Sequence, residues 1–123
     1  MNKVDILLDN KLHDAIITSL KYMDNNLYIK IDCGGMNISE YFSNLDNICF
    51  TIECINIDKL KFDMEGLILI DELTIDKKDK VIIKILNGDL YLECDNYNIL
   101  SVIEVSKRSK EDIMLDRILK SNI

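Results

Sequence analysis

The sequence contains no proline, no tryptophan and a single histidine, and its longest apolar run, 67–70, is four residues long. The missing proline and tryptophan accompany an abundance of isoleucine, asparagine and lysine that is typical of AT-rich coding, which carries no functional information. A membrane-spanning helix needs about 20 consecutive apolar residues. Charges interrupt the N-terminal segment MNKVDILLDNK, which therefore lacks the apolar core of a signal peptide. We expect a cytoplasmic chain that does not contact membranes.

Metal and disulfide chemistry has few candidate ligands. The four cysteines, Cys33, Cys49, Cys54 and Cys94, include no C-x2-C pair, and one histidine leaves few partners for zinc. Each cysteine lies in a strand-like run, where a free thiol behaves as a small buried apolar group. We expect core thiols in a reducing compartment, with no metal and no cofactor. A disulfide or a metal site is the alternative.

The net charge of −7 is unevenly distributed. Residues 1–105 carry a net charge of −9, and residues 106–123 carry +2. An acidic body repels phosphate backbones and no basic patch is visible, so nucleic-acid binding is not expected. The acidic body either favours encounter with a basic partner or simply keeps a small protein soluble.

No catalytic motif is present. Gly34-Gly35 lacks the spacing and the lysine of a phosphate-binding loop, and neither G-x-S-x-G nor H-E-x-x-H occurs. A nucleophile activated by an imidazole base would have to use His13, the only histidine. The thiol that could reach it is Cys33, but strand parity directs the Cys33 side chain into the core. Asp71 and Glu72 are adjacent in an extended segment and point to opposite faces, so they form no carboxylate pair by proximity. We expect no enzymatic activity.

Two hairpins dominate the pattern. Residues 15–22 and 27–33 alternate, and a two-residue turn at Asn25-Asn26 pairs apolar residues with each other: Tyr22 with Ile29, Leu20 with Ile31, and Thr18 with Cys33. Residues 81–94 carry Asn87-Gly88, the preferred pair for a tight hairpin turn. A hairpin turn centred on Asn87-Gly88 pairs Ile85 with Leu90, Ile83 with Leu92, and Val81 with Cys94.

Further strands are predicted before, between and after the hairpins. Residues 3–8 alternate, and shorter apolar stretches occur at 60–64, 67–75 and 98–105. Residues 48–57 also alternate, but their apolar parity switches, which indicates either a bulge near 53–56 or a strand that is apolar on both faces. Residues 34–47 are irregular, with Ser39 capping a short helical turn that holds Tyr41 and Phe42. This loop is either a flap over one end of the sheet or a contact surface.

The C-terminal segment predicts a helix over residues 109–121. A capping box at Ser109 opens it, and its apolar stripe is read as core packing in preference to a partner groove. The predicted fold is mainly β (α+β): one domain, residues 1–123, with an antiparallel sheet or sandwich of about seven or eight strands and one C-terminal helix. Strand order stays open.

His13 and Asp14 stand just before the first hairpin. They form either a surface recognition pair or a structural junction in which Asp14 accepts backbone N–H bonds and His13 binds a neighbouring carbonyl. Leu12-His13-Asp14-Ala15, then Ile17 and a hairpin with a short Asp/Asn turn, resembles the F/L-H-D opening of small β-rich bacterial proteins of unknown function. The resemblance covers residues 12–33, about a fifth of the chain. Some of these proteins are similar to immunity proteins encoded beside polymorphic toxins, which implies a fold type and toxin neutralisation but no catalytic residues.

The leading functional expectation is a non-catalytic binding domain, immunity-like, that blocks a basic protein such as a toxin. Its candidate binding residues are His13, Asp14, Asp24, Tyr41, Asp71 and Glu72. The second expectation is a self-associating β module that forms a homodimer through a sheet edge or the helix stripe. The third is a small-ligand pocket around His13.

Overall fold

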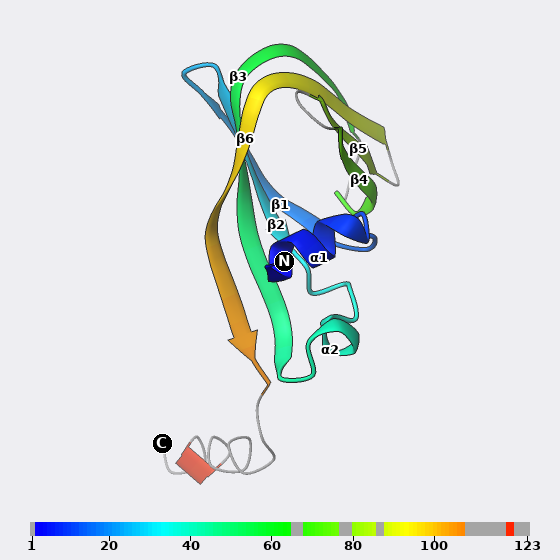
Figure 1. The fold of residues 1–123 in the computed structure, drawn as a ribbon, viewed down its shortest axis with the longest axis vertical. Coiled ribbons are helices and arrows are strands. Elements are labelled where there is room, and N and C mark those ends of the chain that lie inside the picture. The colour runs from blue at the N-terminus through cyan, green and yellow to red at the C-terminus, as the bar shows by residue number, and fades with distance from the viewer. Residues whose placement is uncertain (1, 65–67, 77–79, 86–87, 108–117, 120–123) are drawn as a thin grey trace.

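A computed structural model describes residues 2–64, 68–76, 80–85, 88–107 and 118–119 of the chain. Two short helices and six strands are present in this part (Figure 1). Their bounds are α1 Lys3–Asp9, β1 Ile16–Met23, β2 Asn26–Asp32, α2 Ile38–Tyr41, β3 Leu45–Met64, β4 Ile70–Asp76, β5 Lys80–Ile85 and β6 Gly88–Ser106.

All six strands belong to one antiparallel sheet in the order β1-β2-β3-β6-β5-β4. The long strands β3 and β6 curve together, so that β4 and β5 fold back towards α1 and the start of β1 (Figure 1). A single bridge, between Ile16 and Leu69, then connects the two outer strands at one end. The open sheet therefore curls around α1.

The core lies inside this curl. Apolar side chains from both helices and all six strands form one buried cluster, and the described residues include no buried polar or charged side chain. The predicted core positions Ile29, Ile31 and Cys33 are buried, and Leu20 is partly buried against the cluster. Burial of these apolar side chains is the main contribution that stabilises the curled sheet.

The predicted strand at residues 3–8 is wrong, because these residues form α1. Val4, Ile6 and Leu8 alternate, but Val4 and Leu7 are the buried residues, at a helical spacing of three. The side chain of Asn2 caps the helix by accepting a hydrogen bond from the backbone N–H of Asp5 (2.9 Å). Over seven residues the apolar pattern fits both the strand period of 2 and the helical period of 3.6. The Asn2 cap stabilises the helix, which is the structure that forms.

Both hairpins form, but each predicted register is displaced by two residues. The β1–β2 turn is Asp24-Asn25, with φ of 52° and 66°, and Leu20 pairs with Ile29. A register shift between Ile17 and Ser19 then buries Ile17 in place of Thr18.

In the second hairpin Ile83 pairs with Leu90 and Val81 with Leu92. A shift of two leaves every side chain on its predicted face, so the apolar pattern cannot detect it. In this second hairpin the faces of the side chains were predicted correctly and the residue pairings were not.

Six strands replace the predicted seven or eight because two of them run much further than expected. β3 continues from the predicted 48–57 segment into 60–64, through a register shift between Ile57 and Lys59. β6 joins the end of the predicted 81–94 hairpin to the predicted 98–105 strand without interruption, and it carries a further bulge at Ser101, where φ is 53°. Bulges let a strand bend without ending.

The remaining predictions concern the loop and the C-terminus. α2 is the expected short helical turn, but its N-cap residue is Asn37, not Ser39, because the helix begins two residues earlier than predicted, at Ile38. The predicted helix 109–121 lies outside the described residues except for Ile118 and Leu119, which are helical and 53% and 56% exposed. Among the described residues, no helix has the length and apolar character needed to cross a membrane.

Candidate functional site

The loop that connects α1 to β1 is fastened to β4. The backbone N–H of Asp14 donates to the carbonyl of Ile70 (2.9 Å), and the N–H of Leu73 donates to the carbonyl of Lys11 (2.7 Å). Leu12 is fully buried. Lys11, Leu12 and Asp14 all have left-handed backbone, with φ between 49° and 68°, an unusual concentration in non-glycine residues. The loop is thereby held in one conformation that directs His13 outward.

His13 makes a cross-loop hydrogen bond at this junction. Its Nδ1–H donates to the backbone carbonyl of Asp71 (2.8 Å), 58 residues away in sequence. Its Nε2 lies 3.6 Å from the carboxylate of Asp14, and the imidazole is 62% exposed. The hydrogen bond to Asp71 raises the pKa of His13 above its usual 6.5, and the negative charge of Asp14 raises this pKa further. The predicted structural role of His13, binding a neighbouring carbonyl, is therefore present.

Four of the six predicted site residues meet here. Asp71 lies beside His13, with its carboxylate 3.6 Å from Nδ1, and Glu72 lies 3.8 Å from Lys11. Asp71 thus lies next to His13 and Glu72 next to Lys11, consistent with the expectation that the two carboxylates do not form a pair. The junction places three carboxylates against one lysine and one histidine.

The other two predicted site residues lie elsewhere. Asp24 is in the β1–β2 turn, at the far end of β1 from His13. Tyr41 is in α2, 40% exposed, with its ring centroid 6.4 Å from that of Phe42. Neither belongs to the junction.

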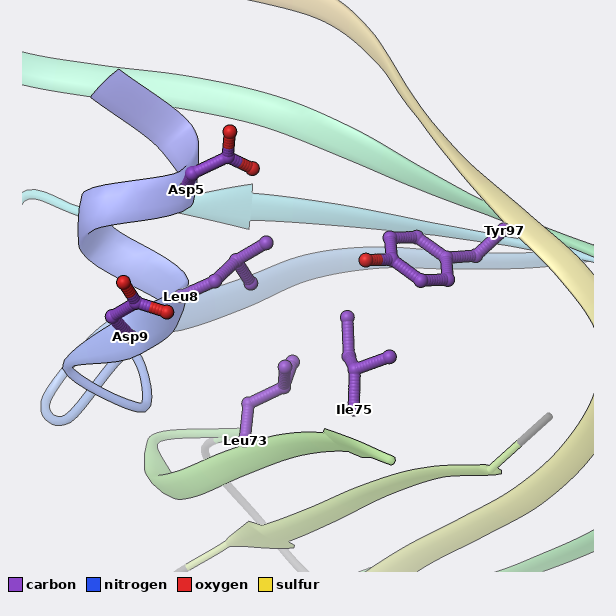
Figure 2. Close-up of a pocket in the computed structure, with 6 residues that line it drawn as sticks. All are labelled: Asp5, Leu8, Asp9, Leu73, Ile75 and Tyr97. Atoms are coloured by element: carbon purple, nitrogen blue, oxygen red, sulfur yellow. The ribbon is translucent and has the colours of Figure 1, made fainter. Parts of the chain in front are cut away.

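A pocket of about 290 Å³ opens next to the junction, between α1, β4 and β6 (Figure 2). Leu8, Leu73 and Ile75 converge on it, and the ring of Tyr97 reaches in with its hydroxyl directed towards α1. The carboxylates of Asp5 and Asp9 stand on the helix side of the pocket, one turn apart. The pocket thus combines apolar walls with two negative charges. Its residues are Asp5, Leu8, Asp9, Leu73, Ile75 and Tyr97.

Sequence reasoning did not find this pocket, because residues 3–8 were read as a strand. In a strand Leu8 points away from the face of Asp5, whereas in a helix residues three and four apart share a face, so Asp5, Leu8 and Asp9 line the pocket together. The signal that could have found it is Asn2 as an N-cap followed by apolar residues at Val4, Leu7 and Leu8.

The pocket and the junction adjoin each other along the chain at two places. Asp9 ends α1, the next loop carries Lys11 and Asp14, and β4 supplies Asp71 and Glu72 before Leu73 enters the pocket wall. We call five carboxylates the acidic rim: Asp5, Asp9, Asp14, Asp71 and Glu72. The cations that lie close to it are Lys11 and His13.

The buried Cys33 thiol is not available as a nucleophile. Burial raises the pKa of the Cys33 thiol to about 12, so the thiolate needed for nucleophilic attack is not formed near neutral pH. None of the four cysteines forms a disulfide, and Cys33, Cys54 and Cys94 are buried as expected, whereas Cys49 is half-buried. Within the described ranges, no group of three or more His, Cys, Asp or Glu side chains is arranged to hold a metal ion.

Comparisons of this chain with protein-family models, with curated proteins and with solved structures find no match.

Proposed function

We propose that this protein is a non-catalytic binding domain that captures a basic segment of another protein, with a lysine or arginine side chain in the pocket of Figure 2. The observation that carries this proposal is the pairing of apolar walls with the carboxylates of Asp5 and Asp9 in one pocket. The net charge of −7 adds long-range attraction for a basic partner.

The pocket suits a long cationic side chain. The aliphatic stem of lysine or arginine packs on apolar walls such as Leu8, Leu73 and Ile75, while its charged head stays with carboxylates at the mouth. The same cation could also make a cation–π contact with the face of the Tyr97 ring. At about 290 Å³ the pocket is at the lower limit of small-molecule sites, which begin near 300 Å³, so a single side chain is the better fit.

Asp9 supports a binding role on energetic grounds. It lies in the last turn of α1, which contains no basic residue. The helix dipole disfavours a carboxylate there by about 0.3–1 kcal/mol. A residue that costs helix stability while it lines a pocket is typical of a functional site.

The basic partner we propose is a toxin that this protein neutralises. The support is the resemblance of residues 12–33 to small β-rich proteins, some of them similar to immunity proteins, together with the acidic rim that this same stretch helps to form. Binding would cover the surface of the toxin that carries its essential basic residues. The proposed location is the cytoplasm.

The test of the pocket is a titration with lysine-rich and arginine-rich peptides at low salt. The double variant Asp5→Asn/Asp9→Asn should weaken binding by roughly tenfold for each carboxylate lost, because each charge-assisted contact is worth about 1.5–3 kcal/mol when partly shielded from water. The control is Asp58→Asn/Asp63→Asn, which removes the same charge from exposed positions of β3. Equal losses would mean that net charge alone attracts the peptide, and no binding at all would overturn the proposal.

The test of the toxin is co-expression with the product of the adjacent gene. We expect the wild-type chain to relieve growth inhibition and the Asp5→Asn/Asp9→Asn variant to relieve it less. A neighbour that is harmless, together with no basic protein retained at low salt, would contradict the immunity-like role.

A further inference from the structure

The second half of β6 has strand neighbours on one side only. β5 pairs with β6 no further than Glu93, whereas β3 continues alongside it to Ser106. Among the described residues, no strand pairs with the other side of residues 96–106, which we call the β6 edge. This half of β6 forms the border of the sheet in Figure 1. An edge of this kind can accept a further strand.

A second edge on the same sheet shows how such a border is normally protected. β2 pairs with β3 only as far as Cys54, so residues 58–64 of β3, the β3 edge, are also unpaired on one side in the described structure. Four of these seven residues are charged: Asp58, Lys59, Lys61 and Asp63. Charged side chains on an edge discourage the addition of another strand.

The β6 edge lacks this protection. Its eleven residues include one charged residue, Glu104, and the carboxylate of Glu104 is held by Lys3 at 2.7 Å. The apolar side chains of this edge are exposed: Leu100 36%, Val102 46%, Ile103 59% and Val105 43%.

The apolar side chains lie on both faces of the β6 edge. On one face, Leu100 and Ile103 border hollows of about 400 and 240 Å³ on the sheet formed by β1, β2 and β3. On the other, Ile99 and Val102 border a hollow of about 560 Å³ next to Val4 of α1. A strand added at this edge would extend the apolar surface of both faces.

We propose that the β6 edge is a dimerisation surface, where β6 pairs antiparallel with β6 of a second copy of this chain. An antiparallel strand pair is compatible with a two-fold axis, so one edge is its own complement. The bulge at Ser101 confines regular pairing to residues 102–106. A register with Ile103 opposite Ile103 of the second copy sets Val102 opposite Glu104 on the other face, and it avoids direct contact between the two Glu104 carboxylates.

The charge distribution favours a second copy over a basic partner at this edge. A basic segment would find one carboxylate, which Lys3 already neutralises. Two copies with a net charge of −7 each would meet along a nearly neutral stripe, with the acidic rim on other elements. Residues 102–106, where the regular pairing is proposed, do not line the proposed pocket, so dimerisation and the pocket can be tested separately.

Sedimentation equilibrium of the full chain tests the proposal at micromolar concentrations. The wild type should have twice the monomer mass of 14.3 kDa. Ile103→Lys should weaken the dimer by about tenfold or more, since a lysine on an edge opposes strand addition and removes a buried apolar contact. The matched control is Phe62→Lys on the β3 edge, where the side chain is 53% exposed. It should leave the dimer intact.

Circular dichroism checks that both variants fold, and Val105→Lys replaces Ile103→Lys should the latter not fold. Amide hydrogen exchange should show that residues 102–106 gain protection as the protein concentration rises. A wild type that stays monomeric would overturn the proposal. So would a dimer that survives both lysine variants on β6, or one that Phe62→Lys dissociates equally. Protection of 102–106 only on addition of a basic peptide would assign the edge to a foreign partner.

Discussion

The β1–β2 hairpin is joined to β4 at its open end through charged residues, and to β3 and β6 at its turn through amides. At the turn, the Asn25 side-chain amide donates to Asn56 Oδ1 (2.9 Å), and the Asn56 backbone N–H donates to Asn26 Oδ1 (2.9 Å). Asn56 also donates to the Asp95 carboxylate (2.5 Å).

The two ends differ in what they leave for a partner. The asparagines at the turn satisfy one another and stabilise the bulge of β3, so their hydrogen-bonding capacity is used inside the fold. At the open end, carboxylates outnumber cations, and the excess negative charge faces solvent. Hydrogen bonds confined within the fold stabilise it, whereas an exposed excess charge is available for recognition. The turn is therefore structural, and the open end, with the pocket beside it, is the candidate site.

The largest effect should come from the apolar anchor of the open end. Leu12→Ala removes a fully buried side chain from the loop that carries His13. We expect the free energy of unfolding to fall by about 2–5 kcal/mol, because the lost burial and the remaining cavity add. Urea denaturation measures it. Leu60→Ala, at a position 43% exposed, is the control, and equal losses in both variants would show that Leu12 is no anchor.

The next effect should come from the close approach of two loops at the same end. A Cβ on Gly35 would overlap the backbone carbonyl oxygen of Asp14, whereas one on Gly34 would meet only the side chains of Asp32 and Asn47. We expect Gly35→Ala to lower the unfolding free energy by about 1–3 kcal/mol. Gly34→Ala should cost less. Thermal melts of the two variants decide, and the reverse order would contradict the packing described for Asp14.

A smaller effect is expected at the turn. Asn56→Ala removes the hydrogen bonds to Asn25 and Asp95 and places alanine at a φ of 58°. Left-handed backbone costs alanine about 1 kcal/mol, and exposed hydrogen bonds contribute little more, so we expect a loss of about 1–2 kcal/mol. Asn56→Gly, which tolerates this φ, should lose less. Equal losses in both variants would show that the hydrogen bonds, and not the backbone, determine the cost.

The smallest effect, and the one that depends on pH, belongs to His13. Because its folded pKa is raised above 6.5, the protonated form is favoured in the folded protein. The stability that this contributes is fully present below pH 6.5 and is lost as pH rises through the folded pKa.

An NMR titration of His13 should give a pKa above 6.5, and Asp14→Asn should lower it. His13→Gln should remove this part of the pH dependence from urea denaturation between pH 5 and 8. A His13 pKa at or below 6.5 would contradict the geometry at the open end.

Several features of this fold were predictable from short-range pattern. Alternation in residues 27–33 correctly assigned Leu27, Ile29 and Ile31 to the core, and the turn asparagines correctly placed a hairpin. The register was not predictable, because a displacement by two residues preserves every face. The type of element at residues 3–8 was not predictable from alternation alone, because seven residues are too few to separate a period of 2 from one of 3.6.

The candidate site shows the same division. His13, Asp14, Asp71 and Glu72 could be singled out as polar residues beside predicted strands, but nothing local indicated that residues 13 and 71 meet. The pocket was missed with α1, since Asp5, Leu8 and Asp9 share a face only when the segment is helical. Asp24 and Tyr41 were singled out on the same local grounds and lie away from the junction.

By itself, the sequence determined which side chains face the core in β2 and in the second hairpin, because the two-residue period of a strand is a property of the covalent chain, whereas the register shift in β1 exchanged Thr18 for Ile17. It also determined an acidic body, because charge is set by composition. Only the tertiary structure decided how far β3 and β6 extend, since β3 continues through a register shift between Ile57 and Lys59 and β6 continues through the bulge at Ser101. The joint curve of β3 and β6 brings β4 back to the start of β1 (Figure 1), and so it assembles the acidic rim and leaves the β6 edge uncovered by any described strand.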